Sequence, residues 1–291
     1  MNLFPSSAPL WLLRAGWLSL ALVAAPALAD AFTDRSRAVQ VVTAAGLWSA
    51  WAVGLVATAV PRTETLTALR LLAPGVVAVA GWAAIGADRP GWGVAGITVA
   101  LVTAALALVG PGVSDAFVDG SSYGDERRVA LRIPAALWAG PLPLAWAAGA
   151  AGATVGPLLL ASEQWIAGAA ATAVGLALVW LVVRQFHQLS RRWLVFVPAG
   201  VVVHDPLRLT DPVLFLRRLL GRVSAADPAD DDAVDLTGGA MGVVVELRSR
   251  EPVTIGLREG TGRAERDGVH AVWVSPVRPG ATLELARQKR L

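Results

Sequence analysis

The sequence contains no cysteine, one tyrosine, one lysine (Lys289) and three histidines. Without cysteine the chain can form no disulfide, thiol nucleophile or zinc–thiolate site. Charged residues are also scarce, at 16% of 291 residues, whereas an average soluble domain has about 25%. Hydrophobic residues make up 55% of the chain. This composition predicts a membrane protein and excludes a disulfide-stabilised secreted fold.

The few charges are unevenly distributed. Residues 1–190 hold 10 basic and 9 acidic residues, and residues 191–291 hold 15 and 13. The sequence therefore predicts a transmembrane domain over 1–190 and a small soluble domain over 191–291. The use of arginine in place of lysine, with abundant alanine and glycine, indicates a GC-rich bacterial genome. A net charge of +3 does not indicate a nucleic-acid-binding protein, so no nucleic acid is expected as a partner.

Long apolar stretches predict about six transmembrane helices, because roughly 20 apolar residues cross the hydrocarbon core. The third stretch is short, and we expect Arg70 to snorkel at its edge. The fifth contains Pro141 and Pro143, which predict a kink. The stretches are 15–32, 38–60, 71–87, 92–110, 133–154 and 165–186.

Loop arginines predict the orientation, since cytoplasmic loops are enriched in basic residues. One side would carry Arg14, Arg62, Arg70, Arg127, Arg128, Arg132, Arg184, Arg191 and Arg192, and the other Arg35, Arg37 and Arg89. This count predicts a multi-pass protein of the bacterial inner membrane with a cytoplasmic C-terminal domain. The sequence Ala27-Leu28-Ala29 leaves a cleaved signal peptide as an alternative, but the late Arg14 favours an uncleaved helix.

The stretch 114–134, SDAFVDGSSYGDERRVALRIP, is polar although it lies between two apolar runs. It belongs to the predicted cytoplasmic loop 111–132. Asp125 could begin a helix that places Arg128 and Arg132 on one face, near the anionic leaflet. Two alternatives are a cation site, whose acidic spacing matches no EF-hand loop, and a solvated loop. The favoured hypothesis is that this loop docks on the C-terminal domain or on a partner through Phe117 and Tyr123. The cation site would be formed by Asp115, Asp119 and Asp125.

Residues 191–291 alternate between apolar runs and turn signals, which predicts strands followed by one helix. Asp211-Pro212 could begin a helix over Val213–Leu220, or the run up to Val223 could be a strand. The other predicted elements are strands Trp193–Val197 and Val201–His204, a hairpin of Met241–Arg248 with Val253–Arg258 around Ser249–Pro252, a strand Val269–Val274 and a helix Thr282–Arg290. This order predicts a small β-rich α+β domain.

Two stretches of this domain resemble the bacterial pleckstrin-homology-like (PH-like) domains that are attached to membrane helices. They are the opening RRWLVFVPAGVVVHD (191–205) and the ending VWVSPVRPGATLELARQ (272–288). The resemblance covers about the last third of the chain and implies a scaffold or interaction role. It identifies no phosphoinositide site, and no ligand residue can be carried over from it.

No signature of a hydrolase, a metalloprotease, a P-loop or a dinucleotide site is present. We therefore expect no enzyme activity, catalytic residue, metal or cofactor. The leading hypothesis is a membrane scaffold, anchor or regulatory protein that binds anionic inner-leaflet lipids and a protein partner, with an oligomeric state that the sequence does not give. The alternatives are a transporter or transporter subunit, and a membrane enzyme that acts on lipid or envelope precursors. The candidate lipid or partner contacts are Arg127, Arg128, Arg132, Arg184, Arg191, Arg192, Phe117 and Tyr123.

Overall fold

The computed structural model of the chain describes residues 8–86, 90–227, 232–260 and 262–291. The described chain forms two compact units. The C-terminal unit combines Ser114–Pro141 with His187–Leu291, and the membrane unit combines residues 8–113 with Leu142–Phe186. Outside the described residues lie Arg89 of the orientation count, Ala87 of the third predicted helix and residues 228–231.

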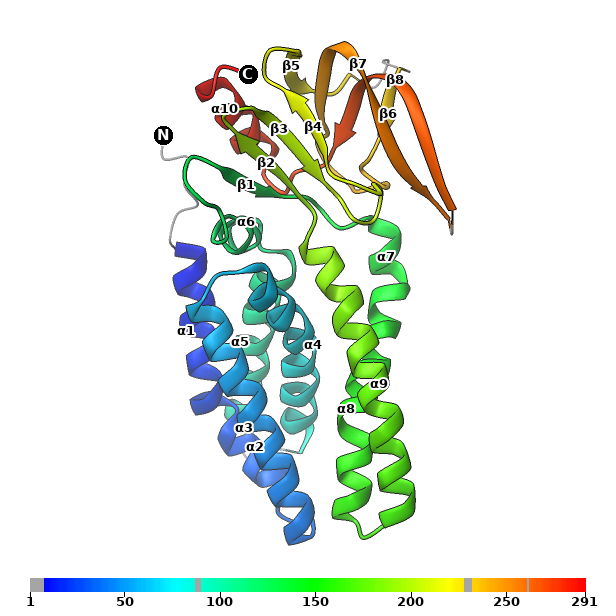
Figure 1. The fold of residues 1–291 in the computed structure, drawn as a ribbon. Coiled ribbons are helices and arrows are strands. Elements are labelled where there is room, and N and C mark those ends of the chain that lie inside the picture. The colour runs from blue at the N-terminus through cyan, green and yellow to red at the C-terminus, as the bar shows by residue number, and fades with distance from the viewer. Residues whose placement is uncertain (1–7, 87–89, 228–231, 261) are drawn as a thin grey trace. The chain divides into compact units, whose positions relative to one another are not determined.

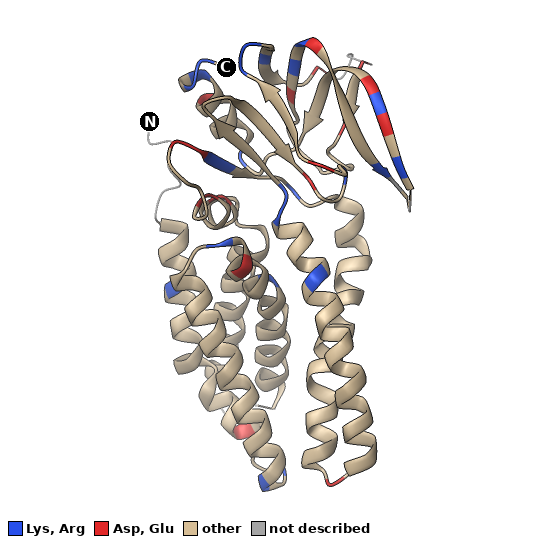
Figure 2. Cartoon of the chain, viewed as in Figure 1, with Lys and Arg blue, Asp and Glu red and all other residues tan. Residues whose placement is uncertain are grey.

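Six helical spans in the described residues are long and apolar enough to cross a membrane. Figure 2 shows that charged residues are sparse along these helices and concentrated in the C-terminal unit. The length and composition of these helices therefore confirm the prediction of a multi-pass membrane protein. The helices before the first strand are α1 (Ala8–Val23), α2 (Ala25–Ala31), α3 (Arg37–Ala59), α4 (Thr63–Ile85), α5 (Pro90–Val109) and α6 (Pro111–Asp119). After that strand come α7 (Ala135–Ala139), α8 (Pro141–Ala161) and α9 (Trp165–Ser190).

One detail of the predicted spans is wrong. Helix α4 begins at Thr63, so Arg70 lies about two turns inside it and is buried, at 6% exposure, instead of snorkelling at its edge. The predicted fifth stretch, 133–154, is interrupted as expected: α7 ends at Ala139, Gly140 is not helical, and Pro141 begins α8 with Pro143 in its first turn. A proline there interrupts no helical hydrogen bond, since the first N–H groups of a helix have no partner within it.

Helices of the membrane unit are held by tryptophan hydrogen bonds and by close glycine contacts. The indole of Trp17 on α1 donates to the carbonyl of Trp51 on α3 at 2.9 Å, and Trp51 donates to the carbonyl of Trp17 at 3.0 Å. Glycines let α8 and α9 approach closely, because a Cβ added at Gly175 would lie 2.1 Å from the Gly152 carbonyl oxygen. Small residues commonly allow such contact between membrane helices.

The C-terminal unit contains two four-stranded sheets and a final helix (Figure 1). The predicted α+β architecture is thus confirmed. The first sheet has the order β1-β2-β3-β4 and is antiparallel throughout, and the second has the order β5-β7-β8-β6, with β6 parallel to β8. The elements are β1 (Arg127–Ala130), β2 (Trp193–Val197), β3 (Gly200–His204), β4 (Val213–Leu216), β5 (Leu220–Ala225), β6 (Ala233–Asp235), β7 (Val245–Glu259), β8 (Gly262–Val274) and α10 (Pro279–Gln288).

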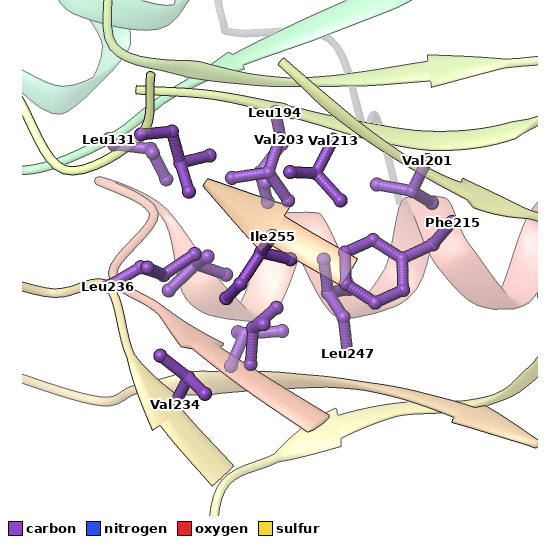
Figure 3. Packing of buried hydrophobic residues seen from close by; sticks show 14 of the residues in the cluster. Leu131, Leu194, Val201, Val203, Val213, Phe215, Val234, Leu236, Leu247 and Ile255 are labelled. Carbon is purple, nitrogen blue, oxygen red and sulfur yellow. The ribbon is translucent and has the colours of Figure 1, made fainter. Parts of the chain in front are cut away.

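The core of this unit is formed by residues that alternate along the strands, as half-buried strands require (Figure 3). Leu194 and Phe196 of β2 are fully buried in it, and Leu131 just after β1 packs in the same cluster. Ala286 of α10 belongs to the cluster, so the last helix covers part of it. The core is therefore built from segments that precede α8 in the sequence and segments that follow α9.

The two alternatives left open for the stretch from Val213 to Val223 are decided in favour of strands, because Val213 and Phe215 alternate into the core as β4 and β5 begins at Leu220. One prediction inside this unit is wrong. The predicted hairpin around Ser249–Pro252 is instead the interior of the long strand β7, which pairs with β8 with register shifts between Arg248 and Val253. The bulge lets the chain pass Pro252 without ending the strand.

Candidate functional site

The polar stretch between the fourth and fifth membrane spans is an integral part of the C-terminal unit. Its strand β1 pairs antiparallel with β2, with Val129 opposite Leu194 and Ala130 opposite Trp193. The chain just after β1 then pairs with the segment that leads into α10. Arg132 N donates to Ser275 O at 2.8 Å, and Val277 N donates to Ala130 O at 2.9 Å. The expectation that this loop docks on the C-terminal domain is confirmed.

The helix predicted from Asp125 is wrong, since residues 127–130 form a strand. Val129 and Leu131 are two positions apart and both enter the core, which a strand allows. Their burial, together with the open edge of β2, outweighs the helical spacing of Arg128 and Arg132. We give the name β1 junction to six residues that lie in β1 or are linked to it by hydrogen bonds, an ion pair or ring contacts: Asp115, Asp119, Glu126, Arg128, Trp193 and His204.

Two carboxylates of α6 cover the outer edge of β1. Asp115 Oδ1 accepts the N–H of Ala130 at 3.0 Å, and Asp119 Oδ1 accepts the N–H of Arg128 at 2.9 Å. Side chains four apart on a helix thus match amides two apart on a strand. An unpaired strand edge attracts other strands, so this arrangement protects β1.

The acidic residues proposed as a cation site do not converge. Asp125 is exposed, whereas Asp115 and Asp119 are occupied by the amides of β1. Across the part of the chain that the structure describes, no group of three His, Asp or Glu side chains could hold a metal ion.

Burial raises the pKa of the Asp115 carboxyl from 3.8 to about 7. Desolvation is the main cause, and the nearby Asp119 adds to it. The hydrogen bond from Ala130 and the positive charge of Arg278 oppose the shift but do not cancel it. Asp115 therefore carries a proton over part of the physiological pH range.

This carboxyl should make stability depend on pH. Between pH 3.8 and about 7 the folded chain binds a proton at Asp115 that the unfolded chain has lost, so stability falls as the pH rises and levels off above 7. Asp115→Asn keeps an acceptor for Ala130 but does not titrate. We expect the variant to show a flatter pH dependence and to be more stable than the wild type by roughly 1–3 kcal/mol at pH 8. Unfolding of the full-length wild type and variant in detergent at pH 5 and pH 8 measures the pH dependence and the difference in stability. An equal pH dependence in the two proteins would contradict the raised pKa of Asp115.

Aromatic and basic side chains stack on the outward face of the first sheet. The Trp193 ring lies parallel to the His204 ring, with centroids 4.7 Å apart, and the Arg128 guanidinium lies 5.3 Å from the Trp193 ring centre. Glu126 forms an ion pair with Arg128 at 2.7 Å. His204 Nδ1 lies 2.6 Å from the Arg191 carbonyl oxygen, so it carries the ring proton. Burial lowers the pKa of His204, more than its hydrogen bond to Arg191 and the charge of Asp205 raise it.

Arg192, predicted as a lipid or partner contact, is instead buried at 2% exposure. Its guanidinium makes two hydrogen bonds to Asp205, at 2.9 and 2.7 Å, and donates a third to the Arg132 carbonyl. Asp205 also accepts the N–H of Leu207 at 3.0 Å. A guanidinium held in this way is not available to lipid or to a partner, and its role is to join β1, β2 and β3.

The other predicted contacts lie in different environments. Phe117 is fully buried, so it serves packing and not surface contact, whereas Tyr123 is 89% exposed. Arg128 belongs to the β1 junction, and Arg132 donates to the Met241 carbonyl at 2.9 Å. The remaining three are Arg127 and Arg191, which are partly exposed, and Arg184, which is exposed on α9 and stacks over Trp180 at 5.6 Å.

One buried charge network was missed by the sequence reasoning. Glu246 is 1% exposed and accepts hydrogen bonds from Arg222 at 3.1 Å, Arg248 at 2.9 Å and the Trp273 indole at 3.4 Å. Its sequence signal was a lone acidic residue within the apolar run MGVVVELR. All partners lie on strands of the second sheet, so the network stabilises that sheet.

The three histidines lie on separate elements: His187 on α9, His204 on β3 and His270 on β8. The β1 junction contributes hydrogen bonds, an ion pair and ring contacts that join α6, β1, β2 and β3. No protein-family model, curated protein or solved structure matches this chain.

Proposed function

We propose that this protein is a non-enzymatic membrane scaffold, anchor or regulatory protein of the bacterial inner membrane. Its C-terminal unit would be a PH-like domain on the cytoplasmic side that binds a protein partner or the inner leaflet. One observation carries the proposal: the β-rich unit is attached to membrane spans through two neighbouring strands, β1 and β2. A domain with two such attachments has less orientational freedom than one on a single linker, which suits the presentation of a binding surface.

The PH-like assignment is supported by the order of the strands. A four-stranded antiparallel sheet comes first, a second sheet follows, and a helix ends the chain. Two features depart from a simple succession of strands: β1 precedes two membrane helices, and β6 is parallel to β8. The order of two sheets and a closing helix supports the assignment despite these two departures.

Contact with anionic lipid is supported by the basic residues at the end of the last membrane helix, α9. Arg191 follows the end of α9 directly, and Arg184 lies in the last turns of the same helix. Near an anionic leaflet each such arginine is worth about 1 kcal/mol. Trp193, two residues after Arg191, is of the type enriched at membrane interfaces.

Photo-crosslinking in cells tests the scaffold function. Benzoylphenylalanine would replace Tyr123, whose side chain is exposed, in the full-length protein. A matched form would also carry Val129→Asp and Leu131→Asp, which remove two core residues and leave the membrane spans unchanged. We expect a specific protein or anionic lipid to be crosslinked only in the first form. The same products from both forms would contradict a role for the folded unit.

A transporter is the second candidate, and Arg70 is the observation that favours it. Ionisable residues buried within membrane spans commonly mark substrate or ion paths, and Arg70 is buried inside α4 together with Thr67. Solute-dependent currents in proteoliposomes that disappear in Arg70→Ala would favour transport. Currents that are equal in both forms would remove this support.

A further inference from the structure

A hollow of about 590 Å³ lies in the C-terminal unit where β4 separates from β7. Just before β4 the chain is paired with β7: Arg258 N donates to Arg208 O at 2.8 Å, and Thr210 N donates to Gly256 O at 2.9 Å. After Pro212 the chain leaves β7 and pairs with β3 instead. The hollow is the wedge between the two diverging strands, and its volume is in the range of ligand sites. We call it the β4–β7 wedge, lined by Thr210, Val213, Leu214, Val253, Thr254 and Gly256.

One side of this wedge is an open strand edge. β4 is the last strand of its sheet, so only β3 pairs with it there. Arg217 N donates to Ala199 O at 2.8 Å, and this bond fixes which residues of β4 are hydrogen-bonded to β3, because such residues alternate along an antiparallel pair. The backbone N–H and C=O groups of Val213 and Phe215 therefore point to β3, and those of Leu214 point away from it. The Leu214 side chain is 40% exposed, and β4 (VLFL) carries no charge that would discourage pairing with another strand.

The other side of the wedge is the long β7–β8 hairpin, which extends beyond the other strands (Figure 1). Its pairing is irregular here, with a register shift between Val253 and Ile255. Three charged residues complete the lining: Asp211, Arg263 and Glu265. Two of the three are acidic and one is basic, and among the described residues none of their side chains forms an ion pair. The excess negative charge favours a ligand with a basic side chain.

We propose that the β4–β7 wedge binds an extended peptide segment of a protein partner, which pairs with the edge of β4 as an additional strand. Main-chain hydrogen bonds to Leu214 provide affinity in this mode of recognition, and pockets for alternate side chains provide specificity. The segment would alternate apolar residues, which contact Val213 and Val253, with at least one Lys or Arg, which pairs with Asp211 or Glu265. This inference rests on the proposed scaffold function and names its class of partner.

Random nine-residue peptides displayed on phage are the probe, selected against the full-length protein in lipid nanodiscs. We expect enrichment of alternating apolar sequences that contain a basic residue. Leu214→Lys places a charge on the open edge, and Leu214→Pro removes the outward N–H. Each should weaken the selected peptide at least tenfold in fluorescence anisotropy, whereas Tyr123→Ala should not. Asp211→Asn with Glu265→Gln should reduce the preference for basic peptides several-fold. Circular dichroism of each variant checks that the β-rich unit is folded.

The result that overturns this inference is a selection in which wild type and folded Leu214→Lys enrich the same peptides, or none. Crosslinking in cells from benzoylphenylalanine at Leu214 and at Tyr123 separates this failure from that of the scaffold function. Crosslinks at Leu214 to an alternating segment of a partner support the inference. A partner crosslinked only at Tyr123 leaves the scaffold function in place and rejects the wedge. No partner at either position rejects both.

Discussion

A C-terminal fragment that begins at Arg191 should fail to fold, whereas the same fragment fused behind residues 114–134 should fold. The shorter fragment lacks β1, so it loses Val129 and Leu131 from the core and leaves the edge of β2 unpaired. Full burial of two such side chains is worth about 3–6 kcal/mol in total, before hydrogen bonds are counted. Since small domains are stable by only about 5–15 kcal/mol, this loss should populate unfolded or aggregated chains. Urea unfolding followed by circular dichroism, and the dispersion of amide NMR signals, compare the two fragments.

The control is a fusion that carries Val129→Asp and Leu131→Asp. It keeps the length and the linker of the folded fusion but cannot insert β1 into the core. We expect it to behave like the short fragment. A cooperative unfolding transition in the fragment that begins at Arg191, at the same urea concentration as in the fusion, would show that β1 is dispensable.

Replacement of Arg192 by alanine should lower the free energy of unfolding by about 3–5 kcal/mol, the usual cost of removing one partner of a buried ion pair. Asp205 would remain buried with two of its hydrogen-bond donors gone. Arg192→Lys keeps the charge but not the paired geometry, so we expect an intermediate loss. The double change Arg192→Met with Asp205→Asn removes both charges and should recover part of the stability. Urea unfolding of the folded fusion measures all three variants.

Arg287 provides the matched control on the surface. Its ion pair with Glu284 has the same length of 2.7 Å, but the Arg287 side chain is 72% exposed. Exposed pairs contribute little, and Arg287→Ala should change the free energy of unfolding by no more than about 1 kcal/mol. Equal losses for Arg192→Ala and Arg287→Ala would mean that burial of the Arg192–Asp205 pair is not what stabilises β1, β2 and β3.

Patterns confined to one segment predicted this structure well. The membrane spans follow from the length of apolar runs, and β2 and β3 follow from WLVFV and VVVH on either side of a Pro-Ala-Gly turn. Such signals are local, because a helix or a tight hairpin satisfies most of its hydrogen bonds within itself. The α+β order of the C-terminal part was readable for the same reason.

Features that depend on residues far apart were not predictable. Arg192 reads as one more arginine at the end of a membrane helix, and nothing within its own segment marks Asp205 as its partner. Residues 127–130 have a spacing that also fits a helix, and only the edge of β2 decides for a strand. The β4–β7 wedge likewise arises from two strands that diverge, which no single segment encodes.

The pairing of β1 with β2 also has a consequence for how the chain is inserted into the membrane. The two strands meet only if α8 and α9 cross as a pair and return the chain to the side that it left. β1 must wait for β2 while the intervening residues are synthesised, which takes several seconds at ~5–20 residues per second. During that time Val129 and Leu131 have no core to enter. The β-rich unit can thus be completed only after α8 and α9 have been inserted correctly. A chain in which one of these two helices fails to cross would keep β1 and β2 on opposite sides of the membrane.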